Sequence, residues 1–181
     1  MIDFKNAFEI SGADKFVHQY YHYYEQVIDK SQVNSLLEIG VAYGHSLNAW
    51  RLVWPEALIE GVEITNISED TRNNFNVYKL SSININDARL IDKTYDMIVD
   101  DGDHHWQSQL LTFYNFYPKA NKYYIIEDML GEYGANKLLE NLPKEVLAKS
   151  YVYDGRGPKR TFVHSKNVEK DTSHKILLIV K

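Results

Sequence analysis

Short apolar runs alternate with longer amphipathic segments along most of the chain, and this alternation constrains the fold more than any other feature. The runs that read as β-strands are residues 35–39, 58–63, 76–80, 95–100, 122–127, 150–154 and 175–180. The segments with helical spacing between them are residues 46–53, 68–74, 105–117 and 132–141. Strands that alternate with helices predict an α/β fold: a mostly parallel, Rossmann-like sheet covered by helices on both faces. The last two runs have no helix between them, which predicts an antiparallel C-terminal hairpin at one edge.

The residues before this pattern differ from the rest. Residues 13–29 contain no Gly or Pro and repeat apolar side chains at helical spacing, which predicts a helix there. We therefore expect one domain over residues 1–181, with a helical extension at 1–30 and an α/β core at 31–181. A short extra strand at 161–164 is also expected. The tyrosines of the N-terminal helix are expected to pack in a core or a subunit contact, with stacking on a sugar ring as the alternative.

Composition removes several classes of protein. Among 181 residues there is no cysteine, so disulfides, zinc–thiolate sites and cysteine nucleophiles are excluded. The formal charge of −5 argues against the broad basic face that binds duplex nucleic acid. No apolar run approaches the roughly 20 residues of a membrane span. The charged residues near the N-terminus interrupt any signal-peptide core, so we expect a cytoplasmic protein without a membrane partner.

Ligands of open α/β sheets bind beyond the carboxyl ends of the strands, so the residues that follow each strand matter most. The first strand runs into residues 38–46, EIGVAYGHS, whose glycines Gly40 and Gly44 allow the backbone to approach a ligand closely. The second strand ends in Glu63, at the spacing typical of a carboxylate that binds ribose hydroxyls. Each feature also has a simpler interpretation, a tight turn and a solvated strand end.

Carboxylates gather after the fourth and fifth strands. Asp100 and Asp101 begin the sequence DDGDHH, and Glu127 and Asp128 close the fifth strand. If these strands are neighbours, the carboxylates of Asp101, Glu127 and Asp128 repel one another, and a hard divalent cation such as Mg²⁺ would offset the repulsion. The alternatives are that some of them cap helices in solvent, or that one is protonated.

Two histidines follow the same acidic sequence. Carboxylates raise the pKa of a nearby imidazole, which makes a general base acting near neutral pH plausible. We assign this role to His104, with His105 as the alternative.

The stretches IVDDGDHH and IIEDM, together with the glycine turn and Glu63, resemble class I S-adenosylmethionine-dependent methyltransferases. More narrowly, they are similar to the metal-dependent macrocin- and mycinamicin-type sugar O-methyltransferases and to cephalosporin-hydroxylase-like sequences. The resemblance spans residues 36–129 and implies a seven-stranded sheet with an antiparallel last strand. Ala42 stands where the first motif of the family usually has a glycine.

The resemblance also implies roles for individual residues. Glu38, Gly40 and Gly44 would line the methionine part of S-adenosylmethionine, and Glu63 would hold its ribose. Asp101, Glu127 and Asp128 would bind Mg²⁺, and His104 would be the base. The remaining predicted cofactor-binding residues are Ser46 at the helix start, Ser82 in the segment expected near the adenine, and Asp100.

These residues predict a methyltransferase whose acceptor is a hydroxyl of a small molecule, with sugar-like vicinal diols favoured, since one metal ion can bind two neighbouring hydroxyls. A second subunit is expected to complete the acceptor pocket in a homo-oligomer. Two rival functions stay open at this point. One is a non-catalytic cofactor-binding or assembly module of the same fold, and the other is a different Mg²⁺-dependent enzyme such as a phosphohydrolase.

Overall fold

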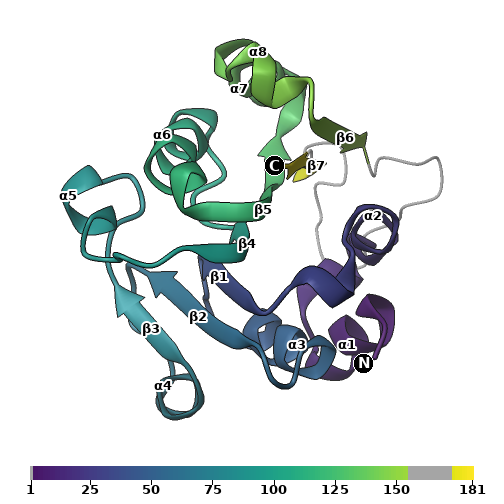
Figure 1. Ribbon diagram of the computed structural model, residues 1–181, viewed down its shortest axis with the longest axis vertical. Helices are drawn as coiled ribbons and strands as arrows, with labels where there is room; N and C mark the ends of the chain where they lie inside the picture. The colour runs from purple at the N-terminus through teal and green to yellow at the C-terminus, as the bar shows by residue number, and fades with distance from the viewer. Residues whose placement is uncertain (1, 155–172) are drawn as a thin grey trace, which may run out of the picture.

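The computed structural model describes residues 2–154 and 173–181 (Figure 1). The helices are α1 (Phe4–Ser11), α2 (Tyr21–Val27), α3 (His45–Val53), α4 (Glu69–Asn74), α5 (Ile85–Ala88), α6 (Trp106–Phe116), α7 (Gly131–Asn141) and α8 (Lys144–Leu147), with 3₁₀ turns at η1 (Asp14–Phe16), η2 (Lys30–Gln32) and η3 (Tyr117–Lys119). The strands are β1 (Ser35–Ile39), β2 (Leu58–Glu63), β3 (Asn76–Lys79), β4 (Tyr95–Asp100), β5 (Ala120–Leu130), β6 (Ser150–Asp154) and β7 (Ser173–Val180). None of the described helices is long and apolar enough to cross a bilayer.

The strands form a seven-stranded sheet in the order β3-β2-β1-β4-β5-β7-β6. The pairs among β1 to β5 are parallel, and β7 runs antiparallel to both β5 and β6. The predicted Rossmann-like sheet with an antiparallel edge hairpin is therefore confirmed. The chain reverses its direction of winding between β1 and β4, and ligands of such sheets bind at that point. The strand expected at 161–164 lies outside the described residues.

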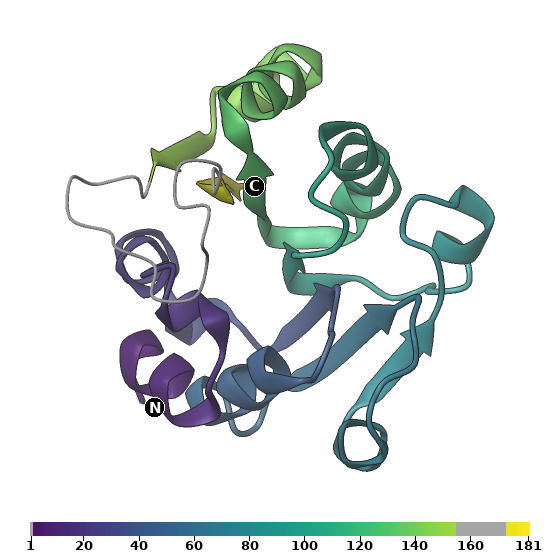
Figure 2. The same ribbon diagram turned by 180° about the vertical axis from the view of Figure 1, so that it is seen from behind.

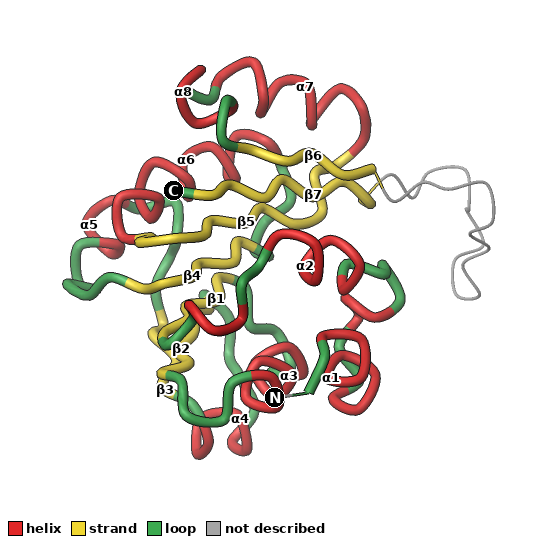
Figure 3. Tube along the Cα trace, turned by 45° about the vertical axis from the view of Figure 1, so that its right-hand side comes forward, coloured by secondary structure: helices red, strands yellow, loops and turns green. Residues whose placement is uncertain are grey.

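Helices cover both faces of the sheet (Figures 1 and 3). One core lies between the sheet and α1, α2 and α3, and it contains the aromatic side chains of Phe4, Phe8, Tyr24 and Trp50. The second core lies between the sheet and α6 and α7, around Phe113, Phe116 and Tyr124. Since strand residues alternate between faces, each buried strand supplies side chains to both cores.

The N-terminal segment differs from the prediction. The expected single helix over residues 13–29 is wrong: η1, an irregular stretch containing Gln19 at φ +57°, and α2 occupy this region. A separate helix, α1, comes first within the helical extension expected at 1–30; it is capped by the Asp3 side chain and ended by Gly12 at φ +73°. The break has a tertiary cause, because the side chains of Lys15, Tyr20 and Tyr24 all reach acidic residues at the sheet (described below).

The N-terminal segment lies close to the C-terminal edge of the sheet. Figures 1 and 2, which view the molecule from opposite sides, both place α2 beside the β6–β7 hairpin. The rings of Tyr23 and Tyr153 stack there with centroids 4.3 Å apart. The segment thus packs against α3 at one end and against the sheet edge at the other, over the carboxyl ends of the central strands.

Candidate functional site: a cleft beside buried carboxylates

A cleft of about 670 Å³ opens at the carboxyl ends of the central strands. Its walls come from the turn after β1, the end of β2, residues 80–83 after β3, and residues 101–104 after β4. Residues 12–14 of the N-terminal segment close one side. The cleft therefore stands where the sheet topology favours a ligand, and its floor reaches the acidic residues that follow β4.

Gly40 lets two segments cross at the floor of the cleft. Its φ is +86°, and a Cβ atom at this position would lie 2.1 Å from the backbone oxygen of Asp101. The amide of Asp101 donates to Ile39 O at 2.8 Å, which ties the end of β4 to the end of β1. Only a glycine permits this close approach, and the approach places the Asp101 carboxylate.

The rest of the turn has the same left-handed character. Gly44 has φ +81° and caps α3, and a Cβ there would lie 2.5 Å from the hydroxyl oxygen of Thr71. Ala42 has φ +47°, so it adopts a glycine-like backbone conformation despite its methyl group. The departure from the usual glycine at this position therefore leaves the course of the turn intact.

Glu63 fixes the turn to the end of β2. Its Oε2 accepts from the amides of Val41 and Ala42, both at 3.0 Å, and its Oε1 accepts from the amide of Thr65 at 2.8 Å and from its hydroxyl at 2.9 Å. Burial alone would raise the pKa of Glu63, but these hydrogen bonds lower it below the ordinary value. The carboxylate is thus ionised and held at the wall of the cleft.

Three carboxylates gather on one face of the sheet next to the cleft. Glu38 lies in β1, Asp101 directly follows β4, and Glu127 lies in β5. These strands are adjacent, and the alternation of side chains brings all three carboxylates to the face covered by α1, α2 and α3. The side chains of Glu38 and Glu127 are at most 1% exposed, and that of Asp101 is 17% exposed.

A β-bulge adds a fourth carboxylate. The register with β7 shifts between Ile126 and Met129, and Asp128 within the bulge has φ +49°. In a regular strand, Glu127 and Asp128 would point to opposite faces. Here both accept hydrogen bonds from tyrosines of the N-terminal segment: Asp128 from the hydroxyl of Tyr20, and Glu127 from that of Tyr24 at 2.5 Å.

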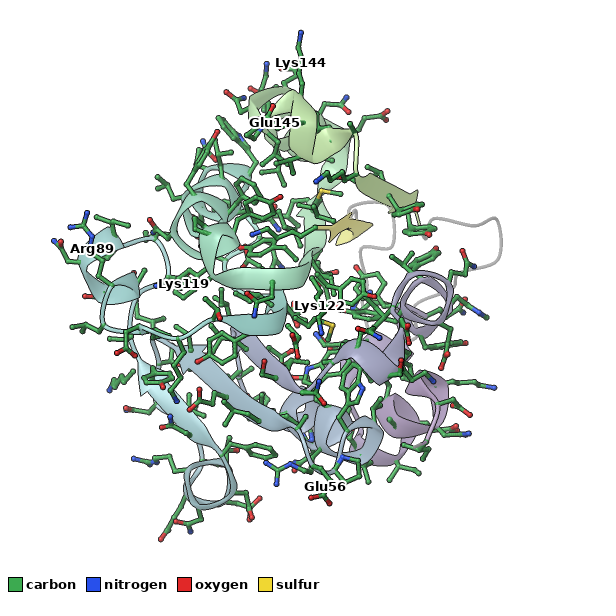
Figure 4. The ribbon with its side chains drawn as sticks, in the orientation of Figure 1. Glu56, Arg89, Lys119, Lys122, Lys144 and Glu145 are labelled. Atoms are coloured by element: carbon green, nitrogen blue, oxygen red, sulfur yellow. The ribbon has the colours of Figure 1, made fainter. Side chains whose placement is uncertain are left out.

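The ammonium group of Lys15 lies among these carboxylates. Its Nζ is 2.6 Å from Asp101 Oδ2 and 3.2 Å from Glu38 Oε1, and it also donates to Glu127 Oε2. The Lys15 side chain is 1% exposed. By contrast, charged side chains such as Glu56, Arg89 and Lys144 lie at the periphery of the molecule (Figure 4).

The charges of this cluster perturb one another. Burial would lower the pKa of Lys15, but the three carboxylates raise it well above its ordinary value, so the ammonium stays charged. Burial would also raise the pKa of Asp101, but Lys15 and His104 lower it to about 2. The pKa of Glu127 is raised well above its ordinary value, chiefly by burial. Asp101 is therefore the carboxylate that stays ionised most firmly.

His104 stands at the opening between the cluster and the cleft. Its Nε2 is 3.5 Å from Asp101 Oδ1 and 3.9 Å from Asp128 Oδ2, and its side chain is 33% exposed. Burial would lower the pKa of His104, but the carboxylates of Asp101 and Asp128 raise it overall. One ligand atom from each of these three residues lies within 4.8 Å of the others, an arrangement that could hold a metal ion.

No model of a known protein family matches this sequence, and no curated protein sequence matches it. Solved structures do match. MycE methyltransferase from the mycinamycin biosynthetic pathway, in complex with Mg, SAH and mycinamycin VI, superposes with a TM-score of 0.74 at 19% identity over 99% of this chain. The match covers 53% of the MycE chain, so this chain spans about half the length of that protein. A SAM-dependent methyltransferase from Archaeoglobus fulgidus matches with a TM-score of 0.54 at 14% identity, over 98% of this chain and 99% of that one.

The chain has the methyltransferase fold. The resemblance deduced from the sequence motifs is confirmed by these superpositions, which at such low identity establish the fold.

The structure brings together only part of the predicted site. Of the predicted site residues, those that line the cleft are Gly40, Ser46, Glu63, Ser82, Asp101 and His104. Asp100 is 1% exposed and points into the core, and Glu38 lies beneath the turn, where its Oε2 accepts from the hydroxyl of Ser46 at 2.6 Å. Gly44 is not part of the cleft lining; it lies in the turn, packed against Thr71. His105 is exposed and stands at the start of α6.

The predicted metal ligands are also arranged unevenly. Asp101 and Asp128 each direct an oxygen toward His104, whereas both oxygens of Glu127 already accept hydrogen bonds, one from Tyr24 and the other from Lys15.

Sequence reasoning missed Lys15, Tyr20 and Tyr24. The available signal was indirect: an excess of carboxylates at neighbouring strand ends demands a positive charge, but nothing in the pattern identifies which lysine supplies it.

Proposed function

We propose that this chain is an S-adenosylmethionine-dependent O-methyltransferase acting on a hydroxyl group of a small, sugar-like diol. The observation that carries the proposal is that two features adjoin: a cleft of about 670 Å³, bounded by the glycine turn and Glu63, meets the ionised carboxylate of Asp101 and the imidazole of His104. A nucleoside cofactor suits the first site, and deprotonation of an acceptor suits the second.

The cleft offers specific contacts to the cofactor. The backbone of the glycine turn can approach the methionine part, and Glu63 can accept from the ribose hydroxyls. The four lone-pair directions of Glu63 already have donors, of which only the hydroxyl of Thr65 can rotate away. We therefore assign the ribose contact to Oε1, in place of the Thr65 hydroxyl.

His104 is the proposed base. Methyl transfer forms a carbon–oxygen bond to the acceptor, breaks the carbon–sulfur bond of the sulfonium, and requires the acceptor hydroxyl to lose its proton. Neutral His104 takes that proton, and Asp101 at 3.5 Å stabilises the imidazolium that results. The pKa of His104 is raised, so the neutral form becomes abundant only above the ordinary pKa of 6.5.

A divalent cation fits the outer edge of the cluster. Asp101 and Asp128 would hold it, with Glu127 as a third ligand only if Lys15 or Tyr24 released it, and His104 is close enough to bind as well. When bound, such an ion would polarise the acceptor hydroxyl and favour loss of its proton. The donor set of two carboxylates and one imidazole supports this assignment, because it suits Mg²⁺ or Mn²⁺.

Cofactor binding tests the proposal. Isothermal titration of the wild-type protein with S-adenosylhomocysteine should give one site per chain, and Glu63→Ala should weaken binding at least tenfold. Glu69→Ala, which removes an exposed carboxylate of α4, is the matched control and should bind like the wild type. Absence of binding by the wild-type protein would refute the proposal.

Activity assays separate the rival functions. A methyltransferase should convert a panel of diols with labelled S-adenosylmethionine and lose turnover in His104→Gln while cofactor binding persists. A phosphohydrolase that used the same carboxylates would release phosphate from generic esters and would not depend on Glu63. A cofactor-binding module without catalysis would bind S-adenosylhomocysteine and convert nothing.

A further inference from the structure

Lys15 occupies the position where a metal ion would be expected to balance the carboxylates. Its Nζ donates hydrogen bonds to Asp101 Oδ2 and Glu127 Oε2 and forms an ion pair with Glu38 Oε1, and the side chain is 1% exposed. It comes from η1, a single 3₁₀ turn outside the sheet, whereas its three partners belong to the central strands or follow them directly. The positive charge is therefore supplied by a separate segment of the same chain.

The carboxylates require such a charge. Like charges a few ångströms apart repel strongly where water is excluded, and here three acidic groups face one buried point. Tyr20 and Tyr24 donate hydrogen bonds to Asp128 and Glu127, but a neutral hydroxyl adds no charge. Among the described residues, the only lysine or arginine that forms an ion pair with this cluster is Lys15.

The ion pairs divide the cluster into two positions. At the inner position, Lys15 occupies one oxygen of each of Glu38, Asp101 and Glu127. At the outer position, which faces the cleft, Asp101 Oδ1 and Asp128 Oδ2 lie 3.5 and 3.9 Å from His104 Nε2. One ligand atom from each of these three residues lies within 4.8 Å of the others. Asp101 thus contributes one oxygen to each position.

We propose that Lys15 is a resident counter-cation, which neutralises the inner carboxylates without a metal and restricts any divalent cation to weak binding at the outer position. The proposal deepens the proposed function, since it names the residue that sets the metal requirement of that site. Lys15 acts here as a positioning residue: it holds Asp101 so that Oδ1 is directed to His104. The fold should then be independent of metal, and metal affinity should rise when the lysine charge is removed.

Metal binding without the cofactor tests this inference. Isothermal titration with Mn²⁺ should show weak binding to the wild-type protein, and Lys15→Gln should bind Mn²⁺ at least tenfold more tightly, because oxygens of Asp101 and Glu127 become free and a nearby positive charge is lost. Lys15→Arg keeps the charge and should bind like the wild type. Lys93→Gln removes a lysine that pairs with a buried carboxylate away from the cleft, Glu60, and it controls for loss of a charge elsewhere.

Thermal unfolding and circular dichroism provide a second test, which is informative even when the Lys15→Gln protein is unstable. The Tm of the wild-type protein should change by no more than about 2 °C in EDTA. If Lys15→Gln unfolds in EDTA, Mn²⁺ should restore its circular dichroism spectrum, since the ion would take over the role of the ammonium. Lys15→Gln combined with Glu127→Gln removes one charge of each sign, and its Mn²⁺ affinity should return to within about threefold of the wild type.

Three results would overturn the inference. They are a Lys15→Gln protein with unchanged Mn²⁺ affinity, a Lys15→Gln protein that stays unfolded in saturating Mn²⁺, and a large loss of Tm when the wild-type protein is treated with EDTA. None of these measurements uses S-adenosylmethionine. Failure of cofactor binding would therefore refute the proposed function and leave the role of Lys15 standing, and the converse also holds.

Discussion

Replacement of Gly40 by alanine tests how the floor of the cleft is built. The left-handed φ of +86° costs an alanine about 1–2 kcal/mol, of which about 0.4–1 kcal/mol is offset by the lower entropy of the unfolded chain. The new Cβ would stand 2.1 Å from Asp101 O, so the chain after β4 must move away. That movement breaks the 2.8 Å hydrogen bond from the Asp101 amide to Ile39 O, worth about 1 kcal/mol.

The expected loss is therefore about 2 kcal/mol before any steric strain is added, which for a chain of this size lowers the Tm by about 4–8 °C. Scanning calorimetry measures the change, and titration with S-adenosylhomocysteine should show weaker binding because the cleft floor is displaced. Ala42→Gly is the control in the same turn. It relieves the left-handed strain of Ala42 at φ +47° and should leave the Tm unchanged or slightly raised. A Gly40→Ala protein with the Tm and affinity of the wild type would refute this account.

Two further predictions concern the buried polar groups. Tyr24→Phe removes the donor to Glu127 Oε1 and should destabilise the protein by about 1.5–3 kcal/mol in urea denaturation; unchanged stability would mean that the oxygen finds another donor. The pKa of Glu63 is lower in the folded protein than its ordinary value of 4.5, so its stabilisation is present above about pH 4.5 and is lost as the pH falls through the folded-state pKa. The Tm of the wild type should thus fall more steeply between about pH 5 and pH 3 than that of Glu63→Gln, and parallel curves would contradict the assignment.

Much of the fold could be predicted from local pattern. The observed bounds of β1, β2, β4 and β6 are those predicted, because each run is short, apolar and followed by residues that end a strand. The N-terminal segment could not be predicted in this way. Its apolar spacing suits a helix over residues 13–29, but the chain breaks near Gln19 because burial of Lys15 and Tyr20 against the carboxylates outweighs helical continuity.

The candidate site was predictable in the same uneven manner. Glu63 and the glycine turn lie at the cleft because strand ends of a parallel sheet share one edge, a property that follows from topology. The orientation of each carboxylate did not follow from it. The bulge at Asp128 brings this carboxylate into the same cluster as that of Glu127, and no residue pattern in β5 predicts a bulge.

The sequence alone determined where the strands lie along the chain, the edge hairpin and the acidic strand ends, because periodicity and chain connectivity are local properties of the sequence. The pairing of Lys15 with Asp101 and Glu127, which lie 86 and 112 residues further along the chain, was decided only by the tertiary structure. The reason is physical: the energy of a buried ion pair depends on separation in space and on exclusion of water, and neither quantity exists until the N-terminal segment has packed on the sheet.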